Sequence, residues 1–451
     1  MTIKSLQSTS LTNNIFYRSM LAGNDPFNPN SYWISTLGGG TSEYGNSVAT
    51  DSENNSYVFG NTDSTGAGSA DLLLAKYDSA GAVQWQKILG DTGNDNGNFV
   101  TVDASDNVYV IGSVSPPGFG FRFFVAKYNS SGVLQWQRLL QADQGWGITT
   151  DSSGNVYCAG YTTQEGLGSR ELFIAKYDSS GSVQWRKLLG NANSNRAYAI
   201  AIDSSSNLYV CGEHDSGSPN GDDALIAKYD SSGTIQWQRV LGGTGNDTAR
   251  AIAIDSSDNA YIIGYTSSTG AGSNDFLLAK YNSSGTIQWQ RVLGGASAEL
   301  GHSVAIDSSD NVYVVGQTNS TGAGDYDYLI AKYDSSGSVQ WQRTLGGTSE
   351  ELGKSVAIDS SDNLYVFGIG RTTNLGFRAF LLAKLPNDGS LTGTYVLDSL
   401  NIVYAASSLT GATSTLTAST SSLTAATSSA VSSTPTLTDA SASLTSYLVE
   451  L

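Results

Sequence analysis

The chain has 451 residues, a net charge of −17 and 51 glycines. Lysine and arginine together number 23, against 40 acidic residues. Because affinity for nucleic acids rests mainly on basic side chains that neutralise phosphates, this balance argues against a nucleic acid partner. No run of 18 apolar residues is present, so the sequence predicts no membrane span.

The first segment, residues 1–30, contains none of the repeated phrase that fills the middle of the chain. It also lacks a sustained apolar core, so no secretory signal peptide is expected. We therefore predict a separate N-terminal arm over residues 1–30.

Residues 31–397 are dominated by one phrase of about fifty residues that occurs seven times. The copies align on the lysine of an Ala-Lys pair, at Lys76, Lys127, Lys176, Lys228, Lys280, Lys332 and Lys384. A fixed period of this kind indicates a repeat architecture. Within each copy, short alternating apolar runs separated by Gly, Asn, Asp and Ser predict four strands.

Two kinds of connection separate the predicted strands. Two are short polar turns, and two are longer and vary between copies, so alternating strand direction places the longer ones together at one end of the sheet. The first short turn always begins with an aspartate, at Asp51, Asp103, Asp151, Asp203, Asp255, Asp307 and Asp359. Calcium loops are the alternative, but the turns lack the dense alternating oxygen ligands that such loops use, which favours hairpin stabilisation.

Seven copies of four antiparallel strands predict a seven-bladed β-propeller, an all-β fold. The fourth strand of six copies carries a tryptophan, but the seventh copy has Gly393 at the equivalent position. A matching strand around Trp33 precedes the first copy instead. Residues 31–38 are therefore predicted to complete the seventh blade and close the ring.

Residues 398–451 are rich in Ser, Thr and Ala and have a second period. Every seventh position is apolar or alanine, at Ile402, Leu409, Leu416, Leu423, Ala430, Leu437, Leu444 and Leu451. A heptad repeat is typical of helices packed along a seam, which predicts an oligomeric stalk and a homo-oligomer. Ser and Thr are weak helix formers and Pro435 interrupts the run, so an extended or disordered low-complexity linker is the alternative.

The repeated phrase resembles the SBBP family of seven-bladed propeller repeats. The similarity is clearest at Asp307 to Thr318 (DSSDNVYVVGQT), Asp327 to Gly337 (DYLIAKYDSSG) and Trp341 to Gly347 (WQRTLGG). It covers about residues 32–397 and implies the propeller fold. Because such repeats occur in proteins of many roles, it implies little about function.

The leader is similar to the start shared by virion structural proteins of tailed phages, especially marine and cyanobacterial ones. The similar residues are Ile3-Lys4-Ser5-Leu6, Tyr17 to Asn24 and Pro29 to Tyr32. This resemblance implies a docking segment, a location in the virion, and other virion proteins as partners through residues 1–30, residues 398–451 or both. An arm that packs against its own propeller is the alternative.

The sequence shows no constellation typical of catalysis. His214 and His302 are the only histidines and occupy positions that are not equivalent. Cys158 and Cys211 are interpreted as two buried reduced thiols. No spaced His/Cys/Asp/Glu cluster indicates a metal site, so we expect a protein that is not an enzyme and uses no cofactor.

One column of the repeat varies in chemistry, five residues before each hairpin aspartate. It reads Asn46, Asn98, Trp146, Tyr198, Arg250, His302 and Lys354. In a propeller this column is expected to surround one mouth of the central channel. Aromatic rings beside Asn, Arg and Lys suit the binding of a sugar, and adaptation to local packing is the alternative.

These patterns favour a phage virion component, such as a tail fibre, appendage or decoration protein, whose propeller binds a host surface or a partner. A secreted or cell-surface adhesin that binds carbohydrate is the alternative. A glycan-active enzyme is a third hypothesis.

Overall fold

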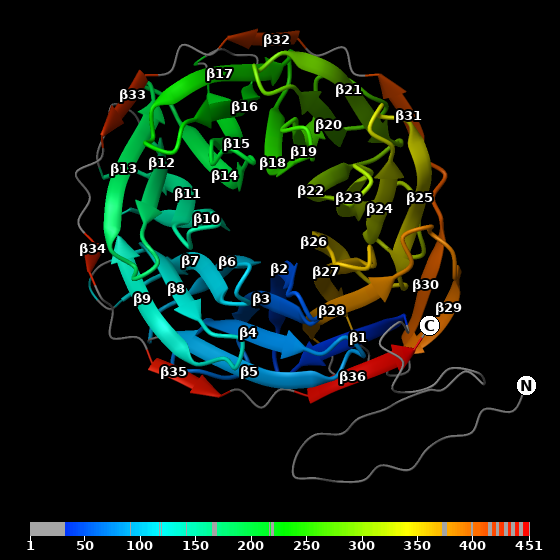
Figure 1. The fold of residues 1–451 in the computed structure, drawn as a ribbon. Helices are drawn as coiled ribbons and strands as arrows, with labels where there is room; N and C mark the ends of the chain where they lie inside the picture. The colour runs from blue at the N-terminus through cyan, green and yellow to red at the C-terminus, as the bar shows by residue number, and fades with distance from the viewer. Residues whose placement is uncertain are drawn as a thin grey trace, which may run out of the picture.

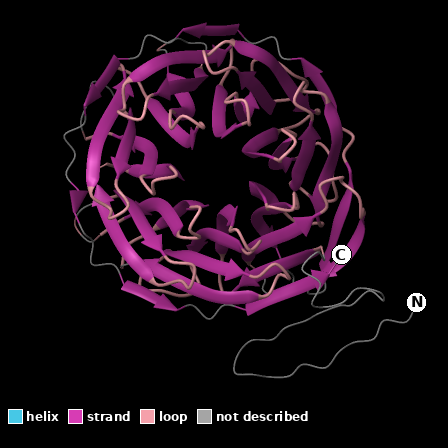
Figure 2. Ribbon diagram, viewed as in Figure 1, coloured by secondary structure: helices cyan, strands magenta, loops and turns pink. Residues whose placement is uncertain are grey.

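The computed structural model describes residues 32–450 apart from 91, 117, 119, 141, 165–168, 216, 218–220, 372–376, 398–399, 414–416, 421–423, 428–431, 434–437 and 442–444. Seven sheets surround a central axis (Figure 1), and the described elements are strands (Figure 2). The chain forms a seven-bladed β-propeller, as the sequence predicts. Within the described residues, no helix is long and apolar enough to cross a membrane.

Blades 1 to 6 place their first four strands in sequence order from the axis outward, blade 7 takes its fourth strand from the N-terminal part of the chain, and neighbouring strands are antiparallel. Blades 1 to 3 are β2 (Glu43–Thr50), β3 (Ser56–Thr62), β4 (Asp71–Tyr77) and β5 (Val83–Gly90); β6 (Asn96–Val102), β7 (Val108–Val114), β8 (Arg122–Tyr128) and β9 (Leu134–Leu140); and β10 (Gln144–Thr150), β11 (Val156–Thr162), β12 (Glu171–Tyr177) and β13 (Val183–Gly190).

The remaining blades follow the same plan. Blades 4 to 7 are β14 (Asn195–Ile202), β15 (Leu208–Asp215), β16 (Asp222–Tyr229) and β17 (Ile235–Gly242); β18 (Asp247–Ile254), β19 (Ala260–Thr266), β20 (Asp275–Tyr281) and β21 (Ile287–Gly294); β22 (Glu299–Ile306), β23 (Val312–Thr318), β24 (Asp327–Tyr333) and β25 (Val339–Gly346); and β26 (Leu352–Ile358), β27 (Leu364–Arg371), β28 (Arg378–Leu385) and β1 (Trp33–Gly38).

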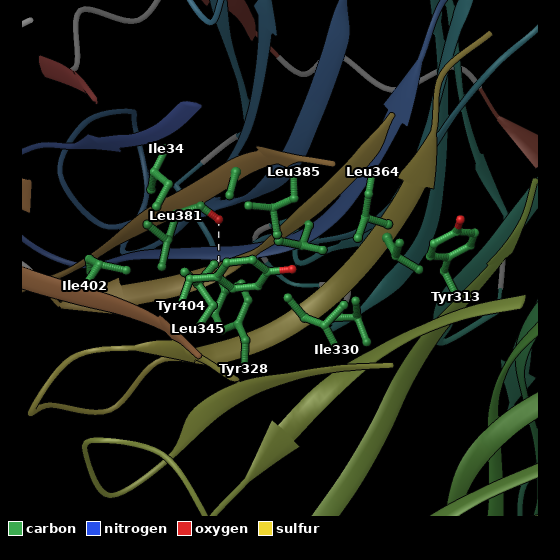
Figure 3. Close-up of a cluster of buried hydrophobic side chains, with 14 residues drawn as sticks. Ile34, Tyr313, Tyr328, Ile330, Leu345, Leu364, Leu381, Leu385, Ile402 and Tyr404 are labelled. Carbon is green, nitrogen blue, oxygen red and sulfur yellow. Dashed lines mark hydrogen bonds between the residues drawn. The ribbon is translucent and has the colours of Figure 1, made fainter. Parts of the chain in front are cut away.

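The apolar core lies between blades. In the cluster of Figure 3, Tyr328 and Ile330 of blade 6 pack with Leu364 and Leu381 of blade 7. The middle strands are therefore buried on both faces, which explains why β3, β7 and β23 are buried along their whole length. Burial of apolar area between blades stabilises the ring by roughly 25 cal/mol for each Å² removed from water.

Strand β1 closes the ring, which confirms the predicted closure by an N-terminal strand. It pairs antiparallel with β28, and Trp33 lies opposite Lys384. The same register joins Trp85 to Lys76 in blade 1. Trp33 is fully buried, and its Nε1 donates a hydrogen bond to the carbonyl oxygen of Ser79, at 3.2 Å, in the neighbouring blade.

The C-terminal segment corrects the stalk interpretation. After β28, the hairpin β29 (Gly393–Leu397) and β30 (Leu400–Ala406) adds to the outer edge of blade 6. The chain then travels around the ring in reverse blade order and adds one short strand to each remaining blade (Figure 1). These strands are β31 (Thr410–Thr413), β32 (Thr417–Thr420), β33 (Thr424–Thr427), β34 (Ser432–Ser433), β35 (Thr438–Ser441) and β36 (Thr445–Glu450). We call β30–β36 the C-terminal belt.

The heptad period matches the spacing between blades. Strands β31, β32 and β33 begin at Thr410, Thr417 and Thr424, one heptad apart. Seven extended residues span about 23 Å, so one heptad carries the chain from one outer blade edge to the next. Ile402 and Leu409 are buried against blade cores, whereas the later heptad positions lie outside the described residues. The predicted docking arm at residues 1–30 also lies outside them, and the homo-oligomer stays a prediction.

Candidate functional site

The repeated aspartate organises the first hairpin of each blade, as Asp255 shows in blade 5. Its Oδ1 accepts hydrogen bonds from the backbone N–H of Ser257 and Asn259, and its Oδ2 accepts one from the Tyr261 hydroxyl at 3.1 Å. Lys280 Nζ lies 3.2 Å from Oδ2 and 4.8 Å from the centre of the Tyr261 ring. Burial alone would raise the pKa of Asp255, but the hydrogen bonds from Asn259 and the charge of Lys280 lower it. This carboxylate is therefore engaged by the fold, which supports the hairpin interpretation over calcium binding.

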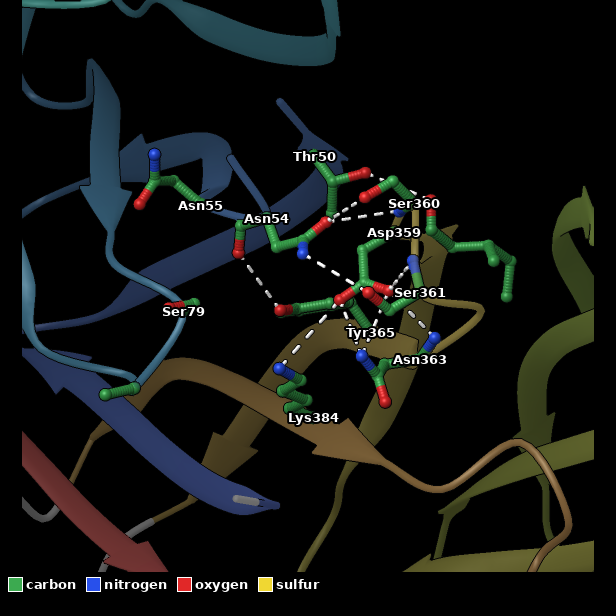
Figure 4. A network of polar contacts seen from close by, with 12 residues as sticks. Thr50, Asn54, Asn55, Ser79, Asp359, Ser360, Ser361, Asn363, Tyr365 and Lys384 are labelled. Atoms are coloured by element: carbon green, nitrogen blue, oxygen red, sulfur yellow. Dashed lines mark hydrogen bonds and ion pairs between the residues drawn. The ribbon is translucent and has the colours of Figure 1, made fainter. Parts of the chain in front are cut away.

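The same hairpins also join neighbouring blades. In Figure 4, the Ser360 hydroxyl of blade 7 donates to Asn54 Oδ1 of blade 1 at 2.7 Å, beside the Asp359–Lys384 ion pair. The Tyr365 hydroxyl donates to the Asn54 carbonyl at 3.2 Å. These shared residues fix one blade against the next.

The fourth-strand tryptophans have a similar structural role. Trp237 Nε1 donates to the Ser283 carbonyl in the next blade at 3.1 Å. Gly285 in that turn has φ +78, and a Cβ there would lie 2.7 Å from the Trp237 ring. The turn therefore requires glycine both for its backbone conformation and for contact with the indole.

The variable column occupies a special backbone position in every blade. The pairing between first and second strands jumps over one residue, as between Ala249 and Ala251, which leaves Arg250 as the extra residue of a β-bulge. The same jump leaves out Asn46, Asn98, Trp146, Tyr198, His302 and Lys354 in the other blades. A bulge bends the strand and re-aims the side chain of the extra residue. We call these seven residues the axial ring.

The axial ring lies at the third or fourth position of each innermost strand. Arg250, for example, is the fourth residue of β18. The ring therefore lies partway along the axis rather than at its mouth. This difference arises because each innermost strand begins before the apolar run that predicts it.

Two residues of the axial ring, Asn46 and Asn98, make hydrogen bonds that join neighbouring blades. Asn46 Nδ2 donates to the Gly97 carbonyl at 2.7 Å, and Asn98 Nδ2 donates to the Gly145 carbonyl at 2.6 Å. Both acceptors lie in the next blade, directly before its own bulge residue. The local-packing alternative therefore describes Asn46 and Asn98.

Three adjacent members, Trp146, Tyr198 and Arg250, lie in contact with one another. The rings of Trp146 and Tyr198 meet edge to face with centroids 5.6 Å apart. The Arg250 guanidinium carbon lies 4.2 Å from the Tyr198 ring centroid and 5.7 Å from that of Tyr265. Burial raises the pKa of Tyr198 to about 12, although the Arg250 charge opposes this. Tyr198 is therefore neutral at pH 7, and Arg250 is fixed between two rings.

The last two members lie together beside a glutamine. Lys354 Nζ is 3.3 Å from His302 Nε2 and 3.4 Å from Gln317 Oε1. Burial, reinforced by the Arg250 charge, lowers the pKa of Lys354 to about 8. Burial and the charges of Lys354 and Arg250 hold the pKa of His302 well below its usual range, so the imidazole is neutral at pH 7.

Sequence reasoning missed Tyr265 and Gln317, which lie on second strands opposite the ring. It also missed the bulge, although one signal was present: the residue before each ring position is glycine or alanine. A Cβ on Gly45 would lie 2.5 Å from the Gly368 carbonyl oxygen in the neighbouring blade. Small residues in this column therefore mark the close approach of adjacent blades.

The other candidate groups do not meet at one point. His214 is buried in blade 4, where Nδ1 lies 2.7 Å from Asn195 Oδ1, while His302 belongs to blade 6. Cys158 and Cys211 are free and buried, as predicted. Among the described residues, no group of three or more His, Cys, Asp or Glu side chains is arranged to hold a metal ion.

Comparison with protein families supports the repeat assignment. The SBBP model, described as a β-propeller repeat, matches residues 140–168, 184–213, 236–270 and 288–322. A second model, a β-propeller domain of unknown function, matches residues 257–287. The chain therefore carries SBBP-type repeats within a seven-bladed propeller.

Similar proteins share parts of this pattern. An uncharacterised WD repeat-containing protein of Acanthamoeba polyphaga mimivirus is 24% identical over 38% of this chain and 17% of its own length. The regulatory protein FlaEY of Caulobacter vibrioides is 29% identical over 25% of this chain and 14% of its own length. The matches thus span less than a fifth of either relative.

Solved propellers resemble the chain at low sequence identity. The WD40 domain of Neurospora crassa Pan2 is 12% identical with a TM-score of 0.45, and the match covers 76% of this chain and 89% of that one. Sqt1 of Chaetomium thermophilum is 11% identical with a TM-score of 0.44, over 82% of this chain and 98% of that one. The fold assignment rests on the strand topology.

Proposed function

We propose that the protein is a non-enzymatic binding scaffold whose propeller presents the axial ring to a ligand on a host surface or on a partner protein. One observation carries this proposal. The Asp, Lys, Tyr and Trp positions that join the blades repeat around the ring, whereas the bulge residue changes from Asn to aromatic to cationic. Since bulges re-aim side chains, this is the position at which a repeated blade acquires individual chemistry.

The attachment of this scaffold to a phage particle is part of the proposal. Its support is the resemblance of the leader to tailed-phage virion proteins, since residues 1–30 lie apart from the repeats. The belt engages the C-terminal segment on the propeller itself, which favours residues 1–30 as the docking segment. A secreted or cell-surface carbohydrate-binding adhesin is the alternative.

Binding to glycans tests the scaffold. We expect the wild-type protein to bind a subset of an array of bacterial surface glycans, and simultaneous replacement of Trp146, Tyr198 and Arg250 by Ala to abolish it. Replacement of the exposed Val133, in the turn before β9, by Ala is the control. Binding that survives the triple replacement would contradict a role for the axial ring, and release of reducing sugar would restore the enzyme hypothesis.

Localisation separates the two settings. Immunogold labelling of purified particles is expected to detect the propeller on the virion, and removal of residues 1–30 to release it. A protein that is absent from particles and present on or outside cells would instead support the adhesin.

A further inference from the structure

The cations of the axial ring differ in their partners from Lys280 and Arg378, two cations that belong to ion pairs. Lys280 faces Asp255, and Arg378 pairs with Glu350 at 2.7 Å. Among the described residues, no carboxylate lies within ion-pair distance of Arg250 or Lys354. Glu350 attracts Lys354 electrostatically from beyond ion-pair distance, and the Glu350 carboxylate already forms an ion pair with Arg378.

Arg250, His302 and Lys354 come from adjacent innermost strands, β18, β22 and β26 (Figure 1). The Arg250 charge lowers the pKa of both His302 and Lys354, so the three groups share one electrostatic environment. All three are half-buried rather than fully exposed. Placing positive charges together in a partly desolvated site costs free energy unless an anion compensates them.

We call Arg250, His302 and Lys354 the arc; the hydrogen-bond donors of Arg250 and of Trp146, which lies beside the arc, are only partly used. The Nε of Arg250 is buried without a hydrogen-bond partner within the described residues, and so is the Nε1 of Trp146. Gln317 Oε1 holds the Lys354 ammonium at 3.4 Å and positions it beside His302. A guanidinium is suited to a carboxylate, because an arginine presents paired donors to its two oxygens, and Lys354 adds a second positive charge in the same electrostatic environment.

We propose that the arc of Arg250, His302 and Lys354 binds the carboxylate of an acidic sugar whose ring packs on Trp146 and Tyr198. The inference rests on the proposed binding function and names its ligand class. Arg250 and Lys354 hold the carboxylate oxygens, and neutral His302 donates to or accepts from a neighbouring hydroxyl. The two aromatic side chains provide an apolar face on one side of the arc.

The overall charge favours a ligand with one carboxylate over a polyanion. The protein carries a net charge of −17, so a chain of many negative charges is repelled at long range. A single carboxylate on an otherwise neutral sugar experiences mainly the local field of the arc, since screening at physiological salt acts over about 8 Å. A lone carboxylate on a peptide lacks the hydroxyls and the sugar face that the aromatic side chains and Gln317 accommodate.

The test is calorimetric titration of the full chain with a disaccharide that carries one glucuronic acid, and with the neutral methyl ester of the same disaccharide. We expect the acid to bind at least tenfold more tightly than the ester. Replacements Arg250→Gln and Lys354→Gln should each weaken binding of the acid at least tenfold and leave the affinity for the ester unchanged. The control Lys87→Gln, on the outer strand β5, should change neither.

The outcomes separate this inference from the proposed function. Equal binding of acid and ester, or tighter binding of an acetylated, amidated dipeptide that contains one glutamate, would overturn the acidic-sugar inference. Failure to bind either disaccharide would also overturn it. If the triple Ala replacement still abolishes binding to another glycan, the scaffold function stands without the inference, and if no glycan binds, both fall.

Discussion

At the scale of single residues, the positions shared by all blades stabilise the fold, whereas the variable positions of the axial ring form the proposed site. Lys280 lies between Asp255 and the Tyr261 ring, and its side chain is mostly buried. Arg250, in the same blade, contacts two aromatic rings and, among the described residues, no carboxylate. Lys280 therefore stabilises the blade, whereas Arg250 is a cation of the proposed site.

Replacement Lys280→Met is expected to destabilise the protein. It removes the cation and leaves the buried Asp255 carboxylate without its ion pair, which costs about 3 kcal/mol in comparable buried pairs. Urea unfolding followed by tryptophan fluorescence measures the change. Lys87→Met on the outer strand β5 is the control, and an equal midpoint for both variants would contradict the assigned role.

Two buried carboxyl groups predict a pH dependence of stability. Burial raises the pKa of Glu43 and of Glu351 to about 7, despite hydrogen bonds from Gly39 and Gly347. Because these groups bind a proton more tightly in the folded state, their contribution is fully present below the unfolded pKa of about 4.5 and is lost as pH rises to about 7.

Replacement of both Glu43 and Glu351 by Gln is therefore expected to flatten the fall in unfolding free energy between about pH 4.5 and pH 7. Thermal unfolding across this range provides the measurement. The exposed Glu53→Gln variant should keep the wild-type slope. A double variant whose slope matches wild type would show that these carboxyls ionise freely in the fold.

At the scale of elements, the belt changes the meaning of the C-terminal sequence. The fourth strands of an ordinary blade expose unpaired backbone groups that invite pairing with other chains. Belt strands such as β31 and β32 cover these edges in blades 5 and 4. The described parts of the low-complexity segment are therefore edge strands of the blades.

Truncation after residue 408 is expected to uncover the outer edges of six blades. We expect a lower Tm and self-association at micromolar concentration, both measured on the purified chain by calorimetry and sedimentation velocity. Truncation after residue 441 removes β36 alone and should have a smaller effect. A truncated chain that remains monomeric with an unchanged Tm would show that the belt contributes nothing to edge protection.

The sequence predicts the blades well and the belt poorly, for physical reasons. The strand around Trp33 was recognisable as the missing fourth strand of blade 7, because the same tryptophan pattern occurs in the fourth strands of the other six blades. The seven-residue spacing from Leu409 to Leu444 fits a helical seam, and it fits equally an extended chain that advances by one blade every seven residues. Only the distance between neighbouring blade edges distinguishes these two structures. The axial ring was recognisable in the sequence because its residue type varies from copy to copy. Its bulge and its partners Tyr265 and Gln317 were not, because they depend on the register between neighbouring strands.

At the scale of the whole molecule, one strand decides whether the ring is continuous. Strand β1 pairs with β28 on one side and with β36 on the other, so the N-terminal and C-terminal parts of the chain meet in blade 7. Trp33 packs against Tyr77 of blade 1 and Tyr365 of blade 7. Loss of this indole weakens the closure between first and last blades.

Replacement Trp33→Ala is expected to cost about 3–5 kcal/mol, the usual range for a buried tryptophan. Trp289→Ala, at the equivalent place in blade 5, should cost less because its indole is only half-buried and its blade is continuous in sequence. Chemical unfolding compares the two. Equal losses would indicate that the closing blade is no more sensitive than the others.

A comparison of Arg250→Gln with Lys280→Met in one blade, each measured for Tm and for binding to a glycan ligand of the wild-type protein, separates framework from site. We expect Arg250→Gln to keep the wild-type Tm and to lose binding at least tenfold, whereas Lys280→Met lowers Tm and, below its unfolding temperature, keeps binding. A loss of Tm with intact binding in Arg250→Gln would contradict the division between a shared framework and a functional axial ring.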